Sequence, residues 1–80
     1  MSHPDLTLDV RGLPAPEPMH ECLEKLWQLE PGQRLQMYID REPHPLFSIL
    51  TARGYSYQCT PEHQSFLVTI WSDSQHATRA

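Results

Sequence analysis

Two short segments combine charge with closely spaced prolines, and they hold the side chains best suited to bind a partner or a ligand. The first runs from Arg11 to Pro18 and the second from Asp40 to Pro45. Arginines bind carboxylates and phosphates, a glycine lets another backbone come close, and prolines stiffen a loop at low entropic cost. We therefore predict an anion-binding or protein-binding edge that is formed by Arg11, Gly12, Pro16, Glu17, Pro18, Arg41, His44 and Pro45.

The two arginines also have acidic neighbours that could neutralise them. Arg11 lies two residues after Asp9, and Arg41 lies between Asp40 and Glu42. Such neighbours commonly form exposed salt bridges, which contribute little to stability. Local pairing of both arginines is therefore the alternative to a binding edge, and the sequence leaves it open.

Cys22 and Cys59 are the two thiols of the chain. Two cysteines form neither a disulfide framework nor a four-ligand zinc pattern. Each falls on the apolar side of its predicted element, where a thiol behaves as a small hydrophobic group with a raised pKa and poor access. We expect both to be core residues. The alternative is a persulfide carried by Cys59, which lies near a strand end, or by Cys22.

No residue pattern typical of catalysis or metal binding is present. Glu17 and His20 are spaced as two ligands on one helix face, and His44 or His63 would have to complete the site. No pair has a diagnostic spacing such as His-Glu-x-x-His. The serines lack a Gly-x-Ser-x-Gly setting, and the three glycines stand apart from one another. We predict a non-enzymatic protein with no metal and no cofactor.

Charge and hydrophobicity argue against several kinds of partner. The 80 residues carry a formal net charge of -4 and contain no run of lysine or arginine, so nucleic acids and anionic membranes have little electrostatic attraction for this chain. The longest apolar stretch is far shorter than the ~20 residues that cross a bilayer. The first residues do not resemble a secretion signal. We expect a cytoplasmic protein that binds neither nucleic acid nor membrane.

The spacing of apolar residues predicts four strands and two helices. Apolar and polar residues alternate at 6–10, 35–39, 55–59 and 66–71, which is the period of a half-buried strand. A shorter helix opens at 42–45 and ends before Gly54, which suits a left-handed cap. A longer helix, which Pro31-Gly32 should stop, has its apolar stripe at Met19, Cys22, Leu23, Leu26 and Trp27.

The C-terminal half and the chain ends give three further expectations. The last two strands should form a hairpin with a turn of four residues or more. Tyr38, Leu67 and Trp71 fall on the polar side of their strands; they form a partner surface or shield the sheet rim, unless the register near the C-terminus is shifted by one. Residues 1–5 should be disordered, 6–71 one domain, and 72–80 a flexible tail.

The order of elements is β-α-β-α-β-β, and every strand has one apolar face. Two helices on one side then suffice to cover the sheet. The fold class is an α/β (α+β) two-layer sandwich, with a mixed four-stranded sheet and two helices on one face. If the first two strands are parallel, both helices begin at the same sheet edge, where open α/β sheets usually bind ligands.

A stretch near the N-terminus reads Asp9-Val10-Arg11-Gly12-Leu13 and continues with Ala15-Pro16-Glu17-Pro18 at the start of a helix. This stretch resembles the TusA/SirA-like sulfur-carrier superfamily. Gly32 before a strand and Gly54 after the second helix extend the resemblance to about residues 6–71. It implies the sandwich fold inferred above and a working surface at the start of the first helix. Family members carry a Cys-Pro-x-Pro motif whose cysteine holds a persulfide that passes between proteins.

This chain has Ala15 where the carrier cysteine belongs. A thiolate at a helix N-terminus is stabilised by the helix dipole and by free N–H groups, whereas a methyl group can carry no sulfur. The chain is similar to the cysteine-lacking, uncharacterised branch of the superfamily, which implies a redox or sulfur-metabolism protein as partner. We expect a binding or adaptor module that docks a protein partner or a small anionic ligand at residues 11–18 and 40–45. A persulfide relay is the alternative.

Overall fold

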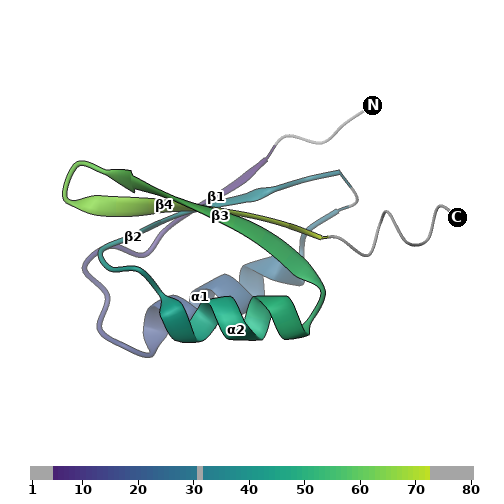
Figure 1. Cartoon of the computed structure of the whole chain (residues 1–80), viewed down its shortest axis with the longest axis horizontal. Coiled ribbons are helices and arrows are strands. Elements are labelled where there is room, and N and C mark those ends of the chain that lie inside the picture. Colours follow the sequence, from purple (N-terminus) through teal and green to yellow (C-terminus); the bar gives the residue numbers. More distant parts are fainter. Residues whose placement is uncertain (1–4, 31, 73–80) are drawn as a thin grey trace, which may run out of the picture.

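The computed structural model describes residues 5–30 and 32–72, and this part of the chain forms six elements (Figure 1). They are β1 (Leu6–Asp9), α1 (Glu17–Leu26), β2 (Leu35–Ile39), α2 (His44–Ala52), β3 (Tyr55–Glu62) and β4 (Ser65–Ser72). The predicted order of strands and helices is confirmed. Neither of the helices described here is long and apolar enough to span a membrane.

The strands form one mixed sheet with the order β1-β2-β4-β3. β1 and β2 are parallel, and β4 is antiparallel to both β2 and β3. Because β1 and β2 run in the same direction, they end at the same edge of the sheet. The two segments that lead into α1 and α2 therefore begin side by side.

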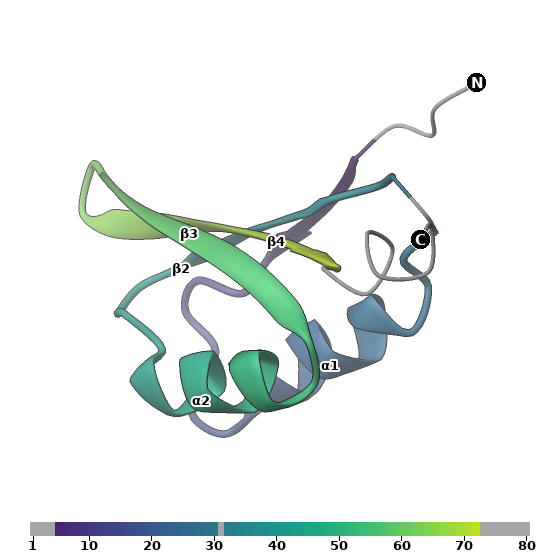
Figure 2. The same ribbon diagram turned by 45° about the vertical axis from the view of Figure 1, so that its right-hand side comes forward.

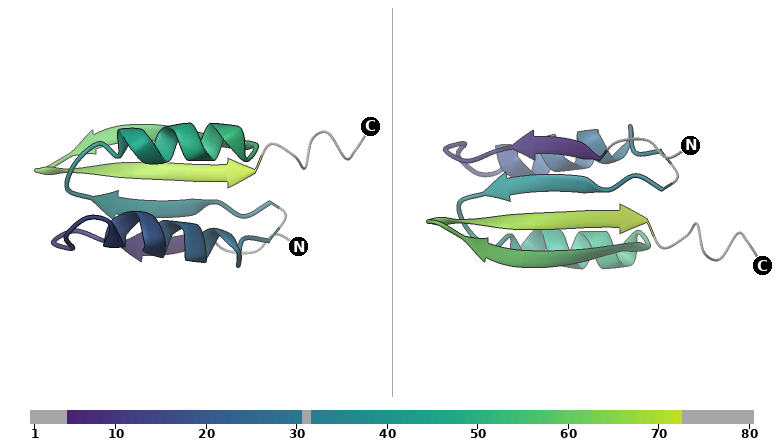
Figure 3. Two further views of the ribbon diagram at one scale, coloured as in Figure 1. Left: turned by 90° about the horizontal axis from the view of Figure 1, so that it is seen from below. Right: turned by 90° about the horizontal axis from the view of Figure 1, so that it is seen from above.

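Both described helices cover the same face of the sheet, and neither of them lies over the other face (Figures 2 and 3). The core fills the space between the two layers, and each strand contributes its alternate residues to it. The predicted two-layer sandwich is confirmed. The largest fully buried side chains are those of Leu35, Met37, Leu46, Leu50, Ile70, Val10, Val68 and Cys22.

α1 ends earlier than its apolar pattern predicts. Beyond Leu26, the N–H groups of Trp27 and Leu29 each bond to the carbonyl three residues earlier, both at 3.2 Å. This tighter winding turns Trp27 away from the sheet and leaves it 84% exposed, while Leu29 packs against the core. The prediction that Trp27 belongs to the buried stripe, and that the helix continues to Pro31-Gly32, is wrong.

α2 ends as predicted. The N–H of Arg53 bonds to the carbonyls of Ile49 and Leu50, at 3.1 Å each. Gly54 follows with a φ of 85°, in the left-handed region that a glycine adopts without a steric penalty. The chain can therefore reverse at once and enter β3.

β3 and β4 form the predicted hairpin, but with a shorter loop. Glu62 pairs with Ser65, so only His63 and Gln64 connect the strands, and Gln64 takes a φ of 58°. The expected turn of four or more residues is wrong because Pro61 does not end the strand. A proline is accepted at a sheet edge, where its missing N–H faces away from the neighbouring strand.

The strand register confirms which side chains lie on the face without helices. Tyr38 pairs with Leu67, and the neighbouring Val68 and Ile70 are fully buried beneath the helices. A shift of one residue would exchange these two faces. Tyr38, Leu67 and Trp71 therefore lie on the open face, where each is half-buried. That they form a partner surface stays a prediction.

The ends of the described chain are tied to the sheet. The Asp5 carboxylate accepts hydrogen bonds from the Arg34 backbone N–H at 3.2 Å and from Gln36 Nε2 at 3.0 Å, although Asp5 lies in the segment expected to be disordered. Ser72, expected to open the tail, is the last residue of β4. The rest of both predicted flexible ends, 1–4 and 73–80, lies outside the described residues.

Candidate functional site

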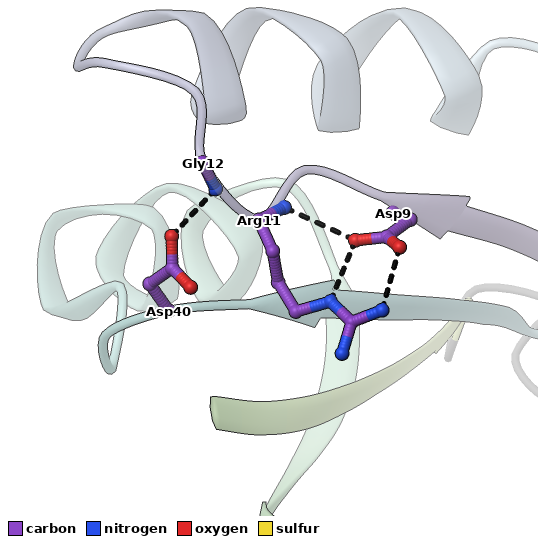
Figure 4. A network of polar contacts seen from close by, with 4 residues as sticks. All are labelled: Asp9, Arg11, Gly12 and Asp40. Atoms are coloured by element: carbon purple, nitrogen blue, oxygen red, sulfur yellow. Dashed lines mark hydrogen bonds and ion pairs between the residues drawn. The ribbon is translucent and has the colours of Figure 1, made fainter. Parts of the chain in front are cut away.

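A hydrogen bond joins the two segments that lead into the helices (Figure 4). The Gly12 N–H donates to Asp40 Oδ2 at 2.6 Å, across a sequence separation of 28 residues. Gly12 has a φ of 85°, which explains a glycine at the turn after β1. The expectation that these two segments meet side by side is confirmed.

An open groove of about 620 Å³ lies between the two segments, and we call it the loop groove. Buried Val10, Ile39 and Leu46 lie at its base. Prolines from both segments make up much of the remaining lining. Its charged lining residues are Asp40, Arg41 and Glu42. The full lining comprises Val10, Gly12, Leu13, Pro14, Ala15, Pro16, Pro18, Met19, Ile39, Asp40, Arg41, Glu42, Pro43, Pro45 and Leu46.

The predicted site residues divide between the loop groove and its surroundings. Those that line the groove are Gly12, Pro16, Pro18, Arg41 and Pro45. Those that do not line it are Arg11, Glu17 and His44. The prolines and the glycine are brought together as expected, whereas only one of the two arginines, Arg41, lines the groove.

Arg11 is paired with Asp9, as the local alternative predicts (Figure 4). Its Nε and Nη2 lie 2.9 and 2.7 Å from the two carboxylate oxygens, and its backbone N–H donates to the same carboxylate at 3.1 Å. These hydrogen bonds lower the pKa of Asp9 to about 2. The guanidinium also lies 5.3 Å from the ring centroid of Tyr38, on the open face. The charge of Arg11 is thus engaged outside the loop groove.

Arg41 differs from Arg11 because its charge is not engaged locally. Within residues 5–30 and 32–72, Arg41 forms no ion pair with a carboxylate. Asp40 accepts the Gly12 N–H, and Glu42 Oε1 lies 3.5 Å from His44 Nε2. Arg41 is exposed at the groove and is the cation best placed to meet a bound group.

The helix starts offer few hydrogen-bond donors. The N-cap residues, Pro16 and Pro43, have no N–H, and each helix has a second proline within its first two positions. The N–H groups of Glu17 and His44 are bound to the carbonyls of Pro14 and Glu42, at 2.9 and 3.0 Å. Few free N–H groups are therefore left at the two helix starts. The loop groove is poor in donors and rich in apolar surface.

Both cysteines lie on the core side of their elements. Cys22 is completely buried, and burial raises the pKa of its thiol to about 12. Cys59 is half-buried in β3, and burial together with the nearby charge of Glu42 raises its pKa. A persulfide carrier needs an accessible thiolate, and both effects reduce the thiolate fraction.

The acidic and histidine side chains of the described segments do not gather. Among them, no group of three or more His, Cys, Asp or Glu residues could hold a metal ion. Glu17 and His20, the pair considered from the sequence, are both exposed on α1.

Several groove residues were not among the eight predicted site residues, because that prediction followed charge, glycine and proline. Leu13 and Met19 are the clearest cases: both line the groove, and Leu13 is 39% exposed. The signal was an apolar pair, Leu13-Pro14, in a loop where polar residues are usual. An exposed apolar pair beside spaced prolines indicates an apolar contact surface.

Fold and groove together define a small two-layer α+β domain with an apolar groove where its helices begin. Residues 7–72 match the model of a conserved family described as an uncharacterized conserved protein, DUF2249. The chain belongs to this family. No curated protein and no solved structure matched the chain.

Proposed function

We propose that this chain is a non-enzymatic binding module whose loop groove holds an extended, apolar segment of a protein partner. The observation that supports this most is the groove itself, which is open, about 620 Å³ in volume and lined mainly by apolar side chains. Prolines on both walls restrict the backbone, so little conformational entropy is lost on binding. The proposal needs no cofactor and no catalytic group.

Charge at the groove favours a protein segment over a small free anion. A phosphate or sulfate needs several donors, and the prolines at both helix starts remove most of them. Arg11 is engaged by Asp9, which leaves Arg41 as the cation at the groove. One arginine beside an apolar groove suits an apolar side chain with a neighbouring carboxylate on the partner.

The resemblance to the TusA/SirA-like carriers supports the same location. Ala15, at the position of the carrier cysteine, lines the loop groove. A surface that sulfur carriers use for contact between proteins would then be kept, without the thiol that transfers sulfur. On this resemblance the partner is a redox or sulfur-metabolism protein, and the setting is the cytoplasm.

A photo-crosslinking residue at position 15, which lines the groove, tests the proposal in cells. Its matched control carries the same residue at Thr51, an exposed position of α2 that does not line the groove. We expect partner proteins that crosslink from position 15 and not from position 51. Leu13→Asp and Arg41→Glu should each reduce this crosslinking, because one places a charge in the apolar wall and the other reverses the charge at position 41.

Arg11→Glu is the second control, because the proposal assigns Arg11 no contact with the partner. Crosslinking should persist in this variant. If Arg11→Glu abolishes crosslinking while Leu13→Asp and Arg41→Glu leave it unchanged, the loop groove is not the binding surface. Titration with inorganic phosphate should show no binding to the wild-type chain, and saturable binding would favour the small anion instead.

A persulfide relay through Cys59 or Cys22 is the rival function, and the burial of both thiols disfavours it. Incubation with a cysteine desulfurase and free cysteine, followed by intact-mass measurement, distinguishes the two. We expect no gain of one sulfur atom. A gain that Cys59→Ser abolishes would replace the binding-module proposal with a carrier.

A further inference from the structure

One side of the molecule is almost free of charge. From Pro43 to Pro61, which covers α2 and most of β3, Arg53 is the only Asp, Glu, Lys or Arg. α1, on the other half of the sheet, carries Glu17, Glu21, Glu24 and Lys25 in ten residues. Depletion of charge in the core of a patch distinguishes protein interfaces from ordinary surface.

The same side ends in an edge strand. β3 has eight residues and lies at one end of the strand order, with β4 as its neighbour in the described sheet (Figure 3). The two residues that flank a two-residue loop exchange backbone hydrogen bonds with each other. The backbone N–H and C=O groups of Glu62 therefore face β4, and so do those of every second residue before it. The N–H groups of Tyr55, Tyr57 and Cys59 then face outward, as does the proline nitrogen of Pro61.

Aromatic side chains line this edge on the helix side of the sheet. The rings of Phe47 and Tyr57 are stacked, with centroids 4.2 Å apart and planes 6° from parallel. Both side chains are only half-buried. A partner at this edge would complete their burial and gain from both backbone pairing and apolar contact.

The outward backbone edge of β3 can pair with the same edge of a second copy. If Tyr57 lies on a two-fold axis, antiparallel pairing places Tyr57 opposite Tyr57 of the second copy, and Tyr55 opposite Cys59. All three outward-facing residues then exchange hydrogen bonds with an outward-facing residue of the second copy. No charged side chain lies between them, because the sequence from Tyr55 to Thr60 contains none.

The charges at the two ends of β3 match the same arrangement. Arg53 precedes β3 and Glu62 ends it, and both are exposed. Antiparallel pairing about Tyr57 brings Arg53 of one copy to the end of the strand where Glu62 of the other lies. The two-fold axis repeats this opposite-charge contact at the other end.

We propose that two copies of this chain associate through β3, so that their four-stranded sheets form one continuous sheet with α2 of each copy beside the axis. The arrangement is isologous and closes at two copies. It buries the exposed backbone edge, which is otherwise a site for uncontrolled pairing. It uses none of the residues that line the loop groove.

Sedimentation velocity of the purified chain up to about 1 mM tests the association, since this range includes weak dimers. We expect a dimer for the wild type and for Tyr57→Phe. Tyr57→Pro should be a folded monomer, because it removes an outward N–H and leaves the pairing with β4 intact. If the wild type is monomeric over this concentration range, the proposal is wrong. Pairing of β3 with a strand of another protein would not rescue it, because the proposed partner is a second copy of this chain.

A disulfide tests the register without relying on a destabilised variant. Residues opposite each other in a hydrogen-bonded pair lie about 5.5 Å apart, within the range that a disulfide bridges. With an added thiol oxidant, Tyr55→Cys should therefore form a disulfide with Cys59 of the second copy. A disulfide within one copy is excluded, because positions 55 and 59 of one strand are about 13 Å apart. Thr7→Cys, on the opposite edge strand, is the matched control and should remain uncrosslinked. Equal crosslinking of both variants, or none in Tyr55→Cys, overturns the register.

Charge exchange gives an independent readout. Arg53→Glu should weaken the dimer roughly 2- to 10-fold, and adding Glu62→Arg should restore it. Failure of the second change to restore association contradicts the proposed contact. Crosslinking from position 15 to a partner should be unaffected in Tyr57→Pro, so the dimer and the loop groove can fail separately.

Discussion

At the residue scale, the two arginines of the predicted edge have different environments. Arg11 is held by Asp9 and lies over Tyr38, while Arg41 is exposed at the loop groove. The difference follows from local geometry, because the turn at Gly12 keeps Arg11 next to the end of its own strand. The sequence allowed both outcomes for both residues, and only the backbone path distinguishes them.

The Asp9–Arg11 pair should stabilise the fold at neutral pH and should make stability depend on pH only in acid. The pKa of Asp9 falls from its usual 3.8 to about 2 because Arg11 donates hydrogen bonds to the carboxylate. A lowered pKa in the folded state adds stability above the unfolded value, and this contribution is lost as the pH falls from about 4 to about 2. Asp9→Asn should flatten the pH dependence of the free energy of unfolding within that window. Urea unfolding at a series of pH values measures it, and identical curves for the two proteins would refute the pairing.

The two thiols should differ in reactivity. At about pH 8, near the usual pKa of a cysteine, iodoacetamide should label Cys59 slowly in the folded chain and leave Cys22 unmodified, because Cys22 is fully buried with a pKa of about 12. Both should react in denaturant. Peptide mass spectrometry reports each site, and Cys59→Ser should abolish labelling of the folded protein. Rapid labelling of Cys22 would show that α1 opens readily.

At the scale of elements, the spacing of apolar residues and the positions of proline and glycine predicted the number, type and order of strands and helices. The strand faces were also predictable, since burial on one side imposes alternation. Ends were harder. Nothing in the spacing of Trp27 distinguishes a helix that continues from one that tightens after Leu26. The hairpin loop was misjudged because Pro61 was read as a strand end.

The end of α1 gives a paired prediction. Trp27→Ser should change the free energy of unfolding by less than about 0.5 kcal/mol, because the side chain is 84% exposed. Leu26→Ala, one residue earlier, should cost about 2–4 kcal/mol because it opens a cavity in the core. Chemical denaturation of both variants checks the contrast. A cost for Trp27→Ser that approaches that of Leu26→Ala would place Trp27 in the core after all.

The location of the candidate site could be predicted from the sequence, whereas its apolar character could not. Parallel strands place the two proline-rich segments at one edge, and this much follows from the order of elements. The apolar character of the loop groove emerges only when Leu13, Met19 and Leu46 converge from three places in the sequence. Convergence of that kind depends on tertiary packing, and its one local signal in the sequence is the apolar pair Leu13-Pro14.

At the scale of the whole molecule, one core between sheet and helices carries the stability. A domain of this size has a free energy of unfolding of about 4–12 kcal/mol. Met37→Ala, at a fully buried position of β2, should remove about 2–5 kcal/mol of it. Met19→Ala, on the half-buried groove wall, should cost clearly less. Thermal and urea unfolding measure both, and equal costs would mean that the groove wall is part of the core.

The direction of the strands also decides where a label or a surface can be attached to this molecule. β1 begins at Leu6 and β4 ends at Ser72, and the register places both at the sheet edge opposite the hydrogen bond between Gly12 and Asp40. The described chain therefore begins and ends on the side away from the loop groove, which suits the attachment of an affinity tag, a fluorophore or a sensor surface. Immobilised chains should present that groove to the solution whichever end is anchored.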